Sequence, residues 1–79
     1  MSKEYYKKRL IDLRSQMAKE REAKKKDNAN YAAKIKTASP SSKPMYRKQK
    51  VDRAASHDRK IESLKKEIER TRDALKCAK

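Results

Sequence analysis

Apolar side chains recur every three or four positions along the first part of the chain. The recurring positions are Tyr6, Leu10, Leu13, Met17 and, after a polar interval, Tyr31 and Ile35. This spacing places them on one face of an α-helix. The residues between them are mostly Lys, Arg, Glu, Ala and Gln, which favour helix. The pattern therefore predicts a helix over residues 3–36, with Ser2 as its N-cap.

A second apolar pattern runs through the last part of the chain and follows a heptad repeat. Its a and d positions hold Ala54, Ile61, Leu64, Ile68, Leu75 and Ala78. Two further d positions are polar and hold His57 and Thr71. This spacing is typical of a coiled coil. It predicts a second helix over about residues 45–77.

The segment between the two patterns contains prolines and serines and predicts a turn over residues 37–44. Pro40 disfavours a helical conformation at Ser39, and Pro44 does the same at Lys43. Pro44 itself suits the first turn of a new helix, where its missing N–H costs nothing. The serine hydroxyls compete with the helix by bonding to nearby backbone groups.

These elements predict an all-α chain with a single domain over residues 1–79. The two helices have similar lengths, which favours an antiparallel, coiled-coil-like hairpin over a straight rod. Oligomerisation or a partner would complete such a thin fold, because a chain of this size is marginal alone. The alternative is a pair of splayed helices held by partner chains.

Folding the chain at Ser41 brings distant residues together. Met17 then lies beside Leu64 or Lys65. The polar middle of the first helix faces the second helix, so that Lys24 lies opposite Asp58 and Asp27 lies near residues 53–57. Two interpretations follow for this polar region. Its ion pairs set the register of the hairpin, or it is a weak, solvated segment to which exposed pairs contribute little.

The composition allows only a thin apolar seam between the helices. Charged residues make up 46% of the chain, and Gly, Trp and Phe are absent; about a quarter is usual for a globular domain. The few apolar side chains at helical spacing are therefore the candidates for an interface with protein. They are Leu10, Leu13, Met17, Ile61, Leu64, Ile68 and Leu75.

Several kinds of chemistry are not expected from this sequence. Without Gly there is no glycine-rich phosphate loop. One Cys and one His cannot supply the usual four protein ligands of a zinc site. We therefore expect no enzymatic activity, no metal, no cofactor and no small-molecule substrate, and we interpret His57 as a polar residue of the seam.

We expect neither a membrane-spanning segment nor a secretory signal peptide in this sequence. No segment has the roughly 20 apolar residues of a membrane span, and the N-terminus has no apolar core of a signal peptide. Cys77 is the single cysteine, which favours a reducing compartment. We expect a cytoplasmic protein without membrane contact.

The net charge of +14 is the strongest indication of a partner. Clusters of basic side chains are candidates for phosphate contacts: Lys7, Lys8, Arg9, Lys24, Lys25, Lys26, Arg47, Lys48 and Lys50. Contacts of this kind bind nucleic acid without reading its sequence. Charged side chains also keep a protein soluble, but solubility requires charges of both signs. An excess of positive charge this large favours a polyanion or an acidic protein as the partner.

The stretches SPSSKPMYRKQK and HDRKIESLKKEIERTRDALK carry a family resemblance. Over residues 39–76 the chain resembles the helical hairpin that precedes the TIR domain in bacterial antiphage effectors. Shared features are a Ser-rich turn, an aromatic-Arg-Lys entry into the second helix and an Ile/Leu heptad. The resemblance implies an interaction or oligomerisation module in antiviral defence. No catalytic residue carries over, because the family's sheet and NAD-cleaving glutamate are absent from this sequence.

Two functions are thus expected. The first is a non-enzymatic, basic helical hairpin that binds protein, either a second copy of itself or a larger effector. The alternative is a small nucleic-acid-binding protein that contacts phosphates without sequence preference.

Overall fold

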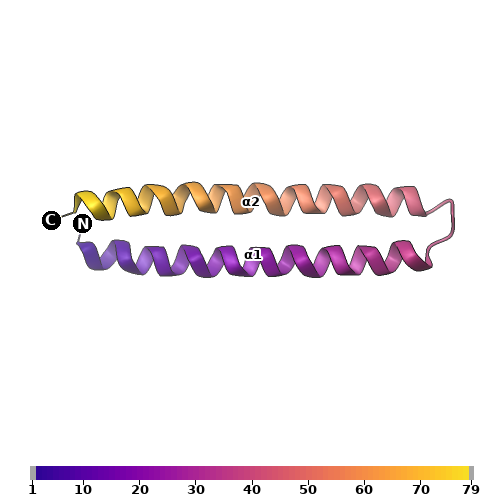
Figure 1. Ribbon diagram of the computed structural model, residues 1–79, viewed down its shortest axis with the longest axis horizontal. Coiled ribbons are helices and arrows are strands. Elements are labelled where there is room, and N and C mark those ends of the chain that lie inside the picture. The colour runs from indigo at the N-terminus through magenta and orange to yellow at the C-terminus, as the bar shows by residue number, and fades with distance from the viewer. Residues whose placement is uncertain (1, 79) are drawn as a thin grey trace.

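The computed structural model describes residues 2–78, which form two long helices lying antiparallel and side by side (Figure 1). The first helix, α1, spans Lys3–Thr37, and the second, α2, spans Lys43–Cys77. Both chain ends lie at one end of the hairpin, and the connection lies at the other. The described residues contain no strand. The predicted all-α helical hairpin is confirmed, in place of two splayed helices.

The hairpin is a thin rod. It measures 61 × 14 × 11 Å and has a radius of gyration of 17.9 Å. A compact domain of this length would have a radius of about 12 Å. Two helices packed along their lengths can cover only one side of each other, and most side chains are consequently exposed.

Local hydrogen bonds explain where α1 begins and ends. The Ser2 hydroxyl accepts a hydrogen bond from the Tyr5 backbone N–H at 3.4 Å, so Ser2 is the N-cap that the sequence predicts. At the other end, the Thr37 hydroxyl donates to the Ala33 carbonyl at 3.3 Å. This bond keeps Thr37 in the helix, which ends one residue later than expected.

Serines build the connection over residues 38–42. The Ser39 carbonyl accepts hydrogen bonds from the backbone N–H groups of Ser42 at 3.0 Å and Lys43 at 3.1 Å. The Ser39 hydroxyl donates to the Ser42 hydroxyl at 3.1 Å. The reversal therefore rests on bonds to Ser39, the residue that Pro40 excludes from helix.

The start of α2 corrects one expectation. Pro44 was expected to keep Lys43 out of the helix, with α2 beginning near Met45, but α2 begins at Lys43. The Ser42 carbonyl accepts from the Tyr46 backbone N–H at 3.2 Å, which closes a first turn around Lys43 and Pro44. Pro44 fits there, as expected, because no bond to its nitrogen is needed in the first turn.

The buried core is confined to α1 near the end that holds both termini. Leu13 is fully buried and Leu10 is 6% exposed, and no residue described in α2 is buried. In the middle of the hairpin the corresponding positions of α1 are polar. Neither helix contains, within residues 2–78, a stretch apolar enough to cross a membrane.

Candidate functional site

The apolar seam is only half covered. Of the seven residues predicted for a protein interface, Leu10 and Leu13 are buried. The other five are half-buried: Met17, Ile61, Leu64, Ile68 and Leu75. The half-buried side chains of α2 thus remain accessible along one stripe, which we call the α2 stripe (Ile61, Leu64, Ile68 and Leu75).

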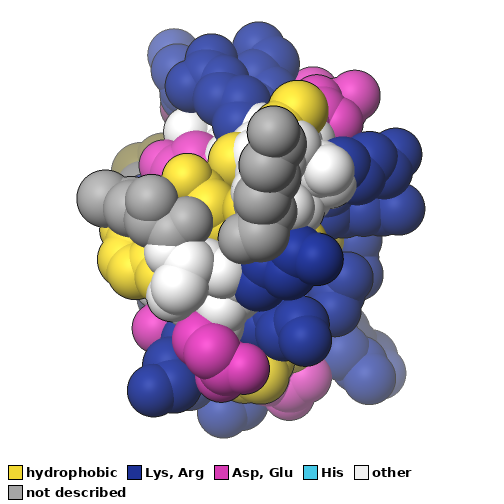
Figure 2. Space-filling view, turned by 90° about the vertical axis from the view of Figure 1, so that its left-hand side faces the viewer, with side chains coloured by type: hydrophobic (Ala, Val, Ile, Leu, Met, Phe, Trp, Pro, Cys, Tyr) yellow, Lys and Arg dark blue, Asp and Glu magenta, His cyan; other side chains and the backbone are white. Residues whose placement is uncertain are grey.

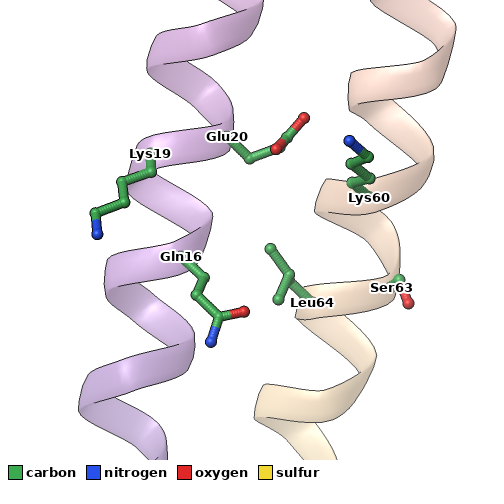
Figure 3. A pocket seen from close by; sticks show the side chains of 6 residues that line it. All are labelled: Gln16, Lys19, Glu20, Lys60, Ser63 and Leu64. Carbon is green, nitrogen blue, oxygen red and sulfur yellow. The ribbon is translucent and has the colours of Figure 1, made fainter.

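An open hollow lies between the helices beside the α2 stripe (Figure 3). It has a volume of about 390 Å³, and Gln16, Lys19 and Glu20 of α1 and Lys60, Ser63 and Leu64 of α2 line it. In Figure 3, Glu20 and Leu64 point toward each other's helix, whereas Lys19 points away from α2. The two helices alone leave this part of the seam unfilled.

Two ion pairs join the helices along their edges. Arg9 Nη2 lies 3.0 Å from Glu67 Oε2, and Lys24 Nζ lies 2.6 Å from Asp58 Oδ1. The second pair confirms the predicted position of Lys24 opposite Asp58. Both pairs are partly exposed to solvent, so each contributes little to stability alone.

A polar cluster of His57, Glu20 and Asp27 occupies the middle of the seam. His57 Nε2 lies 2.6 Å from Asp27 Oδ2, and His57 Nδ1 is in hydrogen-bond contact with Glu20 Oε1. The side chains are 13% exposed for His57, 19% for Glu20 and 30% for Asp27. Asp27 therefore lies beside His57, as the sequence predicts, and His57 is a polar residue of the seam.

The contacts within the cluster shift the pKa values of Asp27 and His57. The hydrogen bond from His57 lowers the pKa of Asp27, with Arg53 adding to the effect, although burial opposes it. The hydrogen bonds to Asp27 and then to Glu20 raise the pKa of His57, against a smaller opposing effect of burial. Both shifts favour the charged forms of Asp27 and His57.

The side chains of the cluster are not arranged to bind a metal ion. Within residues 2–78, no group of three or more His, Cys, Asp or Glu side chains could hold a metal ion. The two carboxylates occupy opposite nitrogens of one ring and do not converge on a common point. Thr71, the other polar d position, donates its hydroxyl proton to the Glu67 carbonyl at 2.8 Å.

Basic side chains cover much of the surface of the rod. Seen along the hairpin from the end with both termini, Lys and Arg side chains project around much of the outline, with acidic ones between them (Figure 2). Lys24 and Lys50 are half-buried, and the other seven candidates for phosphate contacts are exposed. Two of the nine already have carboxylate partners, Arg9 with Glu67 and Lys24 with Asp58.

Sequence reasoning missed Glu20. Glu20 belongs to the polar interval between Met17 and Tyr31, where no apolar position marks the seam. It nevertheless lies seven residues from both Leu13 and Asp27. That heptad spacing is the signal that places it in the seam. Extending the repeat from Leu13 through the polar interval would have identified both carboxylates of the cluster.

Comparison of the chain with protein-family models, with curated proteins and with solved structures gives no match. The resemblance of residues 39–76 to the TIR-effector hairpin stays a prediction.

Proposed function

We propose that this protein is a helical interaction module that binds another protein through the α2 stripe. One observation carries the proposal: the apolar residues of α2 align at heptad spacing, yet none of those described is buried. A coiled-coil seam of this kind gains stability when further helices cover it. The open hollow beside Leu64 adds to the uncovered surface.

The partner is either a second copy or a larger protein with an acidic surface. The resemblance of residues 39–76 to antiphage effectors supports a larger effector as partner. Charge separates the two cases, because two copies each carry +14 and repel each other. Added salt screens this repulsion and strengthens self-association, whereas it weakens binding to an acidic protein.

Light scattering across protein concentration and salt tests the proposal. A molar mass above the 9.3 kDa of one chain that rises with salt indicates self-association. Co-purification of an acidic protein that is released by salt indicates a separate partner. A monomer under all conditions, with no protein retained at low salt, would count against an interaction module.

Nucleic acid is the second candidate, and the excess of positive charge favours it. Within residues 2–78, Arg9 and Lys24 are the basic Lys or Arg side chains that form an ion pair with a carboxylate. Most of the other Lys and Arg side chains in this range are exposed to solvent. A high ratio of absorbance at 260 nm to that at 280 nm, lost in high salt, would identify a bound nucleic acid.

A further inference from the structure

The ring of His57 lies between two carboxylates that approach from the same helix. Glu20 contacts one ring nitrogen and Asp27 the other. An ionised carboxylate only accepts hydrogen bonds, so each ring nitrogen must donate. A neutral imidazole has one N–H, and its second nitrogen would then present a lone pair to a carboxylate oxygen. Only the imidazolium ion satisfies both contacts.

We propose that His57 is bound as an imidazolium between Glu20 and Asp27, and that this proton locks the register of the hairpin in its polar middle. The lock is specific because Glu20 and Asp27 lie one heptad apart. A slip of α2 by one heptad would place His57 between Leu13 and Glu20, or between Asp27 and Lys34. Each slipped register loses one of the two acceptors.

The surrounding charges favour the proton on His57. On α1 the groups that face His57 are Glu20 and Asp27, and Lys24 between them is paired with Asp58 of α2. Arg53 of α2 acts on Asp27. Without the proton on His57, two carboxylates would share the middle of the seam, with Arg53 acting on Asp27 and Lys60 lining the hollow beside Glu20. Like charges that are brought together in this way oppose folding.

The lock would make partner binding by the proposed interaction module depend on pH, and this consequence rests on the proposed function. The raised pKa of His57 means that its stabilising contribution is fully present below the ordinary value of 6.5. The contribution is lost as the pH rises through the pKa of the folded state. Because residues of both helices line the hollow beside the α2 stripe, we expect partner binding to weaken over the same alkaline range.

The experiment is a nitrogen NMR titration of the full chain. His57 is the single histidine, so its ring signals are assigned without ambiguity. We expect the ring nitrogens to titrate with a pKa above the ordinary 6.5. Glu20→Gln and Asp27→Asn should each lower that pKa. Glu22→Gln removes the same charge from an exposed position of α1 and should leave the pKa nearly unchanged.

A second measurement does not depend on how well the carboxylate variants fold. The urea midpoint of the intact chain should fall as the pH rises above 6.5, and His57→Gln should abolish most of that fall. A His57 pKa at or below 6.5 in the intact chain would overturn the proposal. An equal pKa shift in Glu22→Gln, or an unchanged pH dependence in His57→Gln, would overturn it as well.

These outcomes are independent of any partner. A monomer by light scattering that retains no other protein at low salt, together with a raised His57 pKa, would remove the proposed function and leave the proton lock. An ordinary His57 pKa together with assembly would do the reverse.

Discussion

Lys24 and Asp58 meet across the hairpin, with 2.6 Å between the ammonium nitrogen and a carboxylate oxygen. The pair lies beside the His57 cluster, but its side chains are more exposed, 32% for Lys24 and 57% for Asp58. Water and salt screen such a pair well. The hairpin thus carries two kinds of polar contact in its middle, an outer ion pair and an inner hydrogen-bonded cluster.

The outer pair should contribute little to stability. We expect Lys24→Gln to lower the free energy of unfolding by at most about 1 kcal/mol, and the loss to shrink in high salt. Urea unfolding followed by circular dichroism measures it, with Lys25→Gln as a control at an exposed neighbouring position. A loss of several kcal/mol that persists in high salt would show that the pair acts as a buried one.

The inner cluster should make the stability of the hairpin depend on pH in the acidic range. The pKa of Asp27 is lowered, chiefly by its hydrogen bond to His57. Its contribution is therefore present above the ordinary value of 3.8 and is lost as the pH falls through the lower pKa of the folded state. We expect the urea midpoint to fall on acidification below about pH 4.

Asp27→Asn should flatten this acid dependence. Asp12→Asn is the matched control, because Asp12 is an exposed carboxylate of the same helix. An acid transition that is identical in the intact chain and in Asp27→Asn would mean that other carboxylates control it.

The antiparallel arrangement can be measured with spin labels. Cys77 is exposed and is the single cysteine, so one added cysteine makes a defined pair. The label at Cys77 should lie close to one at Ser2→Cys, since both chain ends share one end of the rod. The label at Ser41→Cys should lie about 50 Å from Cys77, the length of α2. Two helices laid end to end, without the reversal at residues 38–42, would give about 100 Å between the chain ends.

The α2 stripe should be required for assembly. Ile68→Asp places a charge in the half-buried seam, which costs of order 3 kcal/mol when the seam is packed. We expect it to abolish any complex detected by light scattering or co-purification. Val51→Asp makes the same change at a position that is 66% exposed and should leave assembly intact. Unchanged helicity and assembly in Ile68→Asp would show that the stripe is no interface.

Heptad spacing and two prolines were enough to predict the hairpin and the Lys24–Asp58 contact, and the capping preference of Ser was enough to predict the cap at Ser2. These features depend on backbone preferences and on distance along a helix, which sequence encodes directly. The place of Glu20 was not predicted, because a glutamate at a seam position is usually unfavourable and becomes favourable only beside His57. The start of α2 at Lys43 depends on one backbone bond, from Tyr46 to Ser42, that no residue type specifies.

The nucleic-acid alternative predicts a salt dependence that the lysines of α1 control. Lys25 and Lys26 are exposed, whereas Lys24 is engaged with Asp58. If both exposed lysines contact phosphates, Lys25→Gln with Lys26→Gln should make the log–log slope of DNA affinity against salt shallower by up to about 1.8. Adding Lys24→Gln should extend the change to about 2.7 only if Lys24 leaves Asp58 for a phosphate.

The matched control replaces Lys65 and Lys66, two exposed lysines of α2, by Gln. Equal changes in slope for the two pairs would mean that DNA contacts all sides of the basic rod. A change confined to Lys25 and Lys26 would locate the contact on α1. Affinity should fall equally for unrelated DNA sequences, because phosphate contacts carry no base information. If no DNA binds even at about 50 mM salt, where counterion release favours binding most, the excess charge belongs to an acidic protein partner.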